Sequence, residues 1–173
     1  MTALDDMRRE KDEYFKHDAY APLTPEQQRD FTGLNYFPEN EALRLEVTVT
    51  PFTPQDVIKM QTSTGGAQTY RRYGRFVFSV DGQAAALTIY SGEHGYFLPF
   101  ADALAGSETY GAGRYLEPEP LGGDRFAVDF NLAYNPYCAY NDRWSCPLTP
   151  GENRLKVAIR AGEKVFHEEG EGH

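Results

Sequence analysis

The chain has 173 residues, a net charge of −9 at neutral pH, and a composition that is 40% hydrophobic and 14% aromatic. These values are typical of a single folded domain and exclude a disordered chain. The negative charge argues against nucleic acid as a partner, because binding to phosphate backbones depends on clustered Lys and Arg.

Neither a membrane span nor a secretion signal is visible in the sequence. No apolar run approaches the roughly 20 residues that a helix needs to cross a bilayer. The opening stretch, MTALDDMRREKDEYFKHDAY, is charged throughout, whereas a secretion signal has an apolar core. We therefore expect a cytoplasmic protein that does not associate with membranes.

Two short helices are expected to form an N-terminal arm over residues 1–35. Asp5 or Asp6 is available as the N-cap of the first helix. The second helix is expected to end at Gly33. Its start is indicated by Thr24 as N-cap, Pro25 at the first helical position and Gln27 in a capping box.

From residue 43 the hydrophobic pattern changes to period two, which is typical of strands with one buried face. Alternating segments are residues 43–50, 75–80, 85–90, 125–132 and 154–161. Shorter strands are expected near 55–62, 69–73, 96–100 and 113–117. Asp81-Gly82 predicts a hairpin turn. We therefore predict a mainly β fold, an antiparallel β-barrel or roll over residues 36–166, followed by a frayed tail at 167–173.

The densest group of candidate functional residues lies within residues 129–146, DFNLAYNPYCAYNDRWSC. Period two places Asp129 and Asn131 opposite the apolar face of their strand, so they point to solvent or into a cavity. Aromatic and amide side chains follow, and these line many small-molecule pockets. We predict that a small polar or anionic metabolite contacts Asp129, Asn131, Tyr134, Asn135, Tyr140 and Asn141.

Arg114 is the natural counter-charge for this pocket. Gly111 and Gly113 beside it allow close backbone approach, and the guanidinium could clamp a carboxylate or phosphate of the ligand. Alternatively, Arg114 forms a buried ion pair with Asp129 that orders the core.

Two other interpretations of the 129–146 segment stay open. In the first, the protein is a metal-independent enzyme that uses Asp129 as general acid or base, with Tyr134 as a candidate partner. In the second, the segment is a structural plug whose polar side chains satisfy backbone groups. Trp144 is expected to close one end of the barrel.

The two cysteines, Cys138 and Cys146, are spaced more widely than the close pairs of zinc sites. His94 is the one interior histidine of the strand region, so a metal set is incomplete. We predict buried free cysteines or one local disulfide, with no metal or other cofactor. The TSTGGAQTYRRYGR stretch does not match a P-loop, and we expect a hairpin loop with solvated arginines.

Several stretches make the chain recognisable. FADALAGSETYGAGRYLE and DFNLAYNPYCAYNDRWSCPLTPGENRLKVAIRAGEK resemble the bacterial and archaeal family called domain of unknown function 1684. The resemblance extends upstream through APLTPEQQRDFTGLNYFP and TSTGGAQTYRRYGRFVF, and so covers nearly the whole chain. It implies a mostly β domain with a helical N-terminal arm, and it carries no assigned activity.

Overall fold

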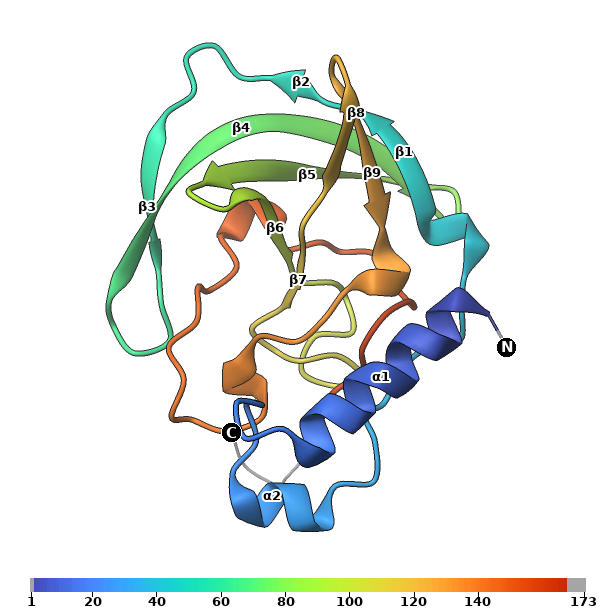
Figure 1. The fold of residues 1–173 in the computed structure, drawn as a ribbon. Coiled ribbons are helices and arrows are strands. Elements are labelled where there is room, and N and C mark those ends of the chain that lie inside the picture. The colour runs from blue at the N-terminus through green and yellow to red at the C-terminus, as the bar shows by residue number, and fades with distance from the viewer. Residues whose placement is uncertain (1, 168–173) are drawn as a thin grey trace.

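The computed structural model describes residues 2–167 and consists of an N-terminal helical arm and two antiparallel sheets (Figure 1). The helices are α1 (Ala3–His17) and α2 (Pro25–Asp30). The three-stranded sheet has the order β1 (Arg44–Thr48), β9 (Arg125–Asp129), β8 (Glu119–Gly122). The six-stranded sheet has the order β2 (Thr50–Pro51), β4 (Ala67–Val80), β5 (Gln83–Gly92), β6 (Gly95–Phe100), β7 (Arg114–Leu116), and β3 (Val57–Gln61) also pairs with β4. Four 3-10 helices complete the described chain: η1 (Glu41–Leu43), η2 (Phe130–Leu132), η3 (Tyr137–Ala139) and η4 (Gly151–Asn153).

The predicted mainly β, antiparallel fold is confirmed, and every paired strand in both sheets runs antiparallel to its neighbour. The closed-barrel alternative is wrong. In the described part of the chain the two sheets have separate strand orders and do not close on each other. A roll therefore describes the fold better than a barrel.

The core lies on the faces that the alternating pattern assigned to it. In β4, Phe76, Phe78 and Val80 are buried while the residues between them are exposed. In the three-stranded sheet, Val47 is paired with Phe126, and both side chains are buried. Period-two burial is the expected result for a strand with one face against the core.

The predicted hairpin turn between β4 and β5 is confirmed. Asp81 and Gly82 have φ values of 49° and 81°, which are the left-handed values that a two-residue primed turn requires. β4 and β5 pair from Val80↔Gln83 back to Arg71↔Ser91, with one register shift at Arg72/Gly74.

Two of the predicted strands end early or are not formed. β9 stops at Asp129, and residues 130–132 form η2 instead of continuing the strand. The predicted strand at 154–161 makes no ladder; it has an isolated bridge between Arg154 and Ala101. Its apolar alternation nevertheless corresponds to burial, since Val157 and Ile159 belong to the core.

The helical arm has the predicted elements with two corrected boundaries. α1 is capped by Thr2, not by Asp5 or Asp6; Asp5 is the partner that completes the capping box. α2 has the predicted start at Thr24, but it ends at Asp30, before Gly33. Both helices lie at the end of the molecule opposite to the β8–β9 turn (Figure 1).

A second apolar cluster joins this arm to the rest of the protein. It contains Phe15, Leu23, Phe31 and Tyr140, with Phe166 packed against it. The Phe15 and Tyr140 rings meet edge to face at 5.1 Å. Of the predicted frayed tail, His167 lies within the described residues and contacts the Tyr140 carbonyl at 2.8 Å; the remainder lies outside them. None of the described helices is both long and apolar enough to cross a membrane.

Candidate functional site

Arg114 is a structural residue, and its charge partner is Asp102 rather than Asp129. The Arg114 side chain is 1% exposed, and its Nη2 lies 3.8 Å from an Asp102 carboxylate oxygen. It also donates hydrogen bonds to the carbonyls of Ile159 (2.9 Å), Glu163 (3.0 Å) and Ala161. The predicted ion pair with Asp129 is therefore wrong, and no surface is left for a ligand clamp.

The Arg114 guanidinium explains why the last predicted strand has no ladder. The three carbonyls that it binds are two residues apart, which is the spacing at which an extended chain turns its carbonyls to one side. Asp102 completes the network by accepting hydrogen bonds from the Ile159 backbone N–H (2.7 Å) and the Thr109 hydroxyl (2.7 Å). Burial lowers the pKa of Arg114 to about 10, and the charge of Asp102 opposes this effect. The side chain is therefore still charged at neutral pH.

In the described part of the chain, Asp129 and Asn131 bind partners other than Arg114. Because β9 ends at Asp129, its carboxylate caps η2 and accepts hydrogen bonds from the Asn131 backbone N–H (3.0 Å) and side-chain amide (2.9 Å). The other carboxylate oxygen of Asp129 accepts from Arg44 Nε at 3.2 Å. Asn131 is buried and exchanges hydrogen bonds with the backbone of Asn40. The common binding mouth expected from the sequence is therefore not formed.

Asp129 instead borders a hollow of about 660 Å³ between β9 and the segment that follows β7. Its charged lining residues are Arg44, Glu46, Glu117, Glu119 and Asp129. An acidic hollow of this kind repels an anionic metabolite. Both oxygens of Asp129 already accept hydrogen bonds, so the structure offers no geometric support for it as a general base.

Two of the other predicted ligand residues bind backbone carbonyls, and a third binds a buried carboxylate. The side-chain amide of Asn135 donates to the Lys164 carbonyl at 3.0 Å. Asn141 donates to the Pro22 carbonyl at 2.8 Å. Tyr140 is fully buried, and its hydroxyl donates to a Glu163 carboxylate oxygen at 2.7 Å. The two asparagine contacts are of the kind that the structural-plug interpretation requires.

Trp144 belongs to the contact with the helical arm and does not close a barrel end. Its indole N–H donates to the Pro22 carbonyl at 3.0 Å, which also accepts from Arg143 at 3.1 Å. The Trp144 ring meets Tyr137 edge to face at 5.1 Å. The loop after η3 therefore holds the chain between α1 and α2.

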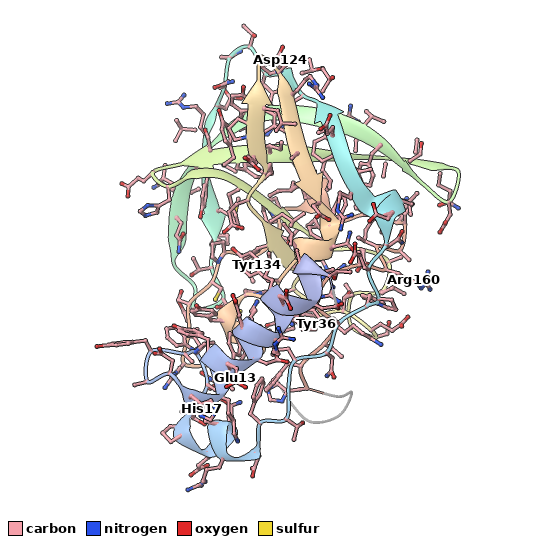
Figure 2. All side chains as sticks on the ribbon, turned by 45° about the vertical axis from the view of Figure 1, so that its right-hand side comes forward. Glu13, His17, Tyr36, Asp124, Tyr134 and Arg160 are labelled. Atoms are coloured by element: carbon pink, nitrogen blue, oxygen red, sulfur yellow. The ribbon has the colours of Figure 1, made fainter. Side chains whose placement is uncertain are left out.

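A cavity of about 210 Å³ lies between α1 and the segment after β9, and it is lined by Leu4, Met7, Arg8, Lys11, Tyr36, Asn131, Leu132, Ala133, Tyr134 and Glu163. Figure 2 shows Tyr36 and Tyr134 close to α1, where they lie under the cations of Arg8 and Lys11 at 4.3 and 5.3 Å from the ring centres. Two residues predicted from the sequence, Asn131 and Tyr134, therefore reach a cavity together. The Tyr134 hydroxyl itself donates to Glu117 at 2.6 Å.

The cavity is bordered by two cations and one carboxylate. Glu163 is 1% exposed; one of its oxygens accepts from Lys11 and the other from Tyr140. Its charge is offset by Lys11, and Arg8 lies close enough to Asp5, Glu39 and Glu163 to interact with their charges. Arg8 uses one nitrogen, Nη1, to donate to the Phe37 carbonyl at 3.0 Å.

Three polar atoms beside this cavity are buried and have no hydrogen-bond partner among the described residues. They are Nε and Nη2 of Arg8 and the hydroxyl of Tyr36. Burial raises the pKa of Tyr36, so its hydroxyl stays protonated and can donate. Buried donors without partners cost about 1–3 kcal/mol each, and most proteins avoid them.

The comparisons with known proteins place the chain in a family without revealing an activity. A family model described as a protein of unknown function (DUF1684) matches residues 29–164. The chain belongs to this family. It is also similar to the solution NMR structure of an uncharacterized protein from Haloarcula marismortui, with 37% identity, a TM-score of 0.69, and coverage of 93% of this chain and 91% of the other. No curated protein matches it.

Arg8, Lys11, Tyr36 and Glu163 line this cavity but were not predicted from the sequence as site residues. A signal was present for the first two, because Leu4, Met7, Arg8 and Lys11 occupy one face of α1 at helical spacing. Two cations on an otherwise apolar stripe indicate that the stripe covers polar groups. Nothing local in the sequence marks Tyr36 or Glu163, which come from segments far apart in the chain.

Proposed function

We propose that the protein binds a small anionic metabolite, a short carboxylate or a phosphate, in the cavity between α1 and residues 131–134. The observation that carries this proposal is the unpartnered Nε–Nη2 edge of Arg8. This edge of a guanidinium presents two parallel donors that match the two oxygens of a carboxylate or phosphate.

Arg72 shows how the same Nε–Nη2 edge of a guanidinium binds a carboxylate in this protein. Its Nε and Nη2 donate to the two carboxylate oxygens of Glu152 at 3.1 and 2.7 Å. Arg8 presents the same pair of donors without a carboxylate from the described chain. A ligand carboxylate would complete the arrangement, and the Tyr36 hydroxyl is a further donor at the cavity.

The size of the cavity limits the ligand. About 210 Å³ is room for about seven water molecules at roughly 30 Å³ each. An organic acid with a similar number of non-hydrogen atoms would fit, whereas a nucleotide would not. We place this binding in the cytoplasm, because the acidic composition suits a soluble protein and the two cysteines are unpaired.

A thermal-shift titration with acetate, pyruvate, succinate and inorganic phosphate tests the proposal. A probe present at about 100 times its Kd should add about 2.7 kcal/mol to the free energy of unfolding. Arg8→Met should abolish that shift. Arg9→Met is the matched control, since Arg9 makes its ion pair with Asp6 on an exposed part of α1, and it should retain the shift.

Two results would refute the proposal. One is the absence of a shift with all four probes on the unmodified protein. The other is a shift that survives in Arg8→Met with undiminished affinity, because the anion would then bind somewhere else.

A further inference from the structure

The two cysteines lie together in a polar environment that the anion cavity does not involve. Cys138 lies in η3 and Cys146 follows the loop after it, and both are buried as free thiols. The Cys138 backbone N–H donates to Cys146 Sγ at 3.3 Å, so the two cysteines are direct neighbours. Structural cysteines more often have an apolar environment.

Hydroxyl groups from two other segments complete this environment. The Tyr110 hydroxyl donates to Cys138 Sγ at 3.6 Å. Ser63, which follows β3, accepts from the Cys146 backbone N–H at 3.1 Å and donates its own N–H to the Cys146 carbonyl. The Tyr110 hydroxyl thus donates to one sulfur and the Cys138 backbone N–H to the other, while Ser63 fixes the backbone of Cys146.

The surroundings of the pair favour the thiolate form of Cys138. The hydrogen bond from Cys146 contributes most to lowering the pKa of Cys138 to about 6; burial opposes it, and Tyr110 and Ser63 add to the lowering. The same contact with Cys138 raises the pKa of Cys146. Cys138 is therefore the more acidic thiol of the pair.

We propose that Cys138 and Cys146 form a reversible dithiol–disulfide site that is oxidised by a small peroxide. The Cys138 thiolate attacks one oxygen of hydrogen peroxide, the O–O bond breaks, and the departing hydroxide takes up a proton to become water. The sulfur of Cys146 then attacks the Cys138 sulfenic acid, and its proton leaves with the hydroxyl group as a second water. Two thiols and one peroxide give one disulfide and two waters, and a dithiol reductant reverses the change.

The position of the pair gives oxidation a structural consequence. The loop between the two cysteines carries Asn141, Arg143 and Trp144, which donate to the Pro22 carbonyl between α1 and α2. A disulfide would close this loop covalently at the point where it holds the helical arm. This inference does not rest on the proposed anion cavity.

Intact mass spectrometry of the full chain tests the proposal. The reduced protein is exposed to hydrogen peroxide, unfolded and treated with N-ethylmaleimide. We expect loss of the mass of two hydrogen atoms and loss of both alkylation sites, with full recovery after dithiothreitol. Cys138→Ser and Cys146→Ser should each lose the intramolecular product.

Two outcomes overturn the proposal. In the first, both thiols of the unmodified protein remain alkylatable under conditions that oxidise a dithiol peptide. In the second, the thiols gain oxygen as sulfinic or sulfonic acid and form no disulfide. Both outcomes are read on the unmodified protein, so the test stands even if a serine variant does not fold.

Discussion

Replacing Arg114 by Met should destabilise the protein severely. The change removes the cation of a pair whose two side chains are each 1% exposed, and it leaves the carbonyls of Ile159, Ala161 and Glu163 without their donor. Removing one partner of a buried pair costs about 3–5 kcal/mol. Each buried carbonyl left unpaired adds about 1–3 kcal/mol.

The lower ends of these ranges, about 3 kcal/mol for the pair and about 1 kcal/mol for each carbonyl, give a loss of about 6 kcal/mol. Domains of this kind have free energies of unfolding of about 5–15 kcal/mol. With a urea dependence of about 2 kcal/mol per molar, the unfolding midpoint should fall by about 3 M.

Urea denaturation followed by tryptophan fluorescence measures this shift. Arg125→Met is the matched control, because Arg125 pairs with Glu46 on the surface, where both side chains are more than half exposed. An exposed pair contributes at most about 1 kcal/mol, so the control midpoint should move by no more than about 0.5 M. If Arg114→Met unfolds at the same urea concentration as the unmodified protein, the structural role assigned to Arg114 is wrong. If that variant yields no folded protein, Asp102→Asn tests the same network with a smaller perturbation.

Two further predictions concern a glycine and an acid-sensitive contact. Gly113→Ala should lower the free energy of unfolding by at least about 3 kcal/mol, because an added Cβ would lie 2.3 Å from Thr149 Oγ1 at a φ of 107°. Gly123→Ala, with open space around it and a φ of 57°, should lower it by about 1 kcal/mol in the same urea assay. Equal losses in the two variants would contradict the packing argument. Burial acts to raise the pKa of Glu152, but hydrogen bonds from Arg72 and Tyr90 outweigh it and place the pKa below the ordinary 4.5. The stability that Glu152 contributes is therefore present above pH 4.5 and is lost as the pH falls through the lowered value. The difference in urea midpoint between the unmodified protein and Glu152→Gln should accordingly shrink on acidification, and a difference that stays constant down to about pH 3 would refute this.

Local patterns in the sequence were sufficient for much of the fold. Alternation identified the buried faces of β1, β4 and β9, because a strand turns successive side chains to opposite sides. The Asp81-Gly82 pair identified the hairpin, because few other residues accept a positive φ. The start of α2 was predictable from Thr24, Pro25 and Gln27, since a capping box is complete within four residues. Each of these features depends on neighbours in the chain.

The candidate site depended on contacts that local patterns do not contain. Alternation predicted a polar face for Asp129 but could not show that the strand stops there, because the carboxylate itself caps the turn that follows. The sequence marked Arg114 as a residue that needs a negative partner, but it offered several acids. Packing of β7 against the loop after β6 brings Asp102 to Arg114.

The sequence by itself determined the mainly β class, the helical arm and the family resemblance. Tertiary structure alone decided that the sheets stay open, that Arg114 binds backbone carbonyls, and that a cavity forms beneath α1. That cavity combines Arg8, Tyr36, Tyr134 and Glu163 from four separate segments. Its key ion pair joins Lys11 to Glu163, which are 152 positions apart. Contacts at such separations arise only when the whole chain has packed, because neither residue constrains the backbone conformation of the other before folding.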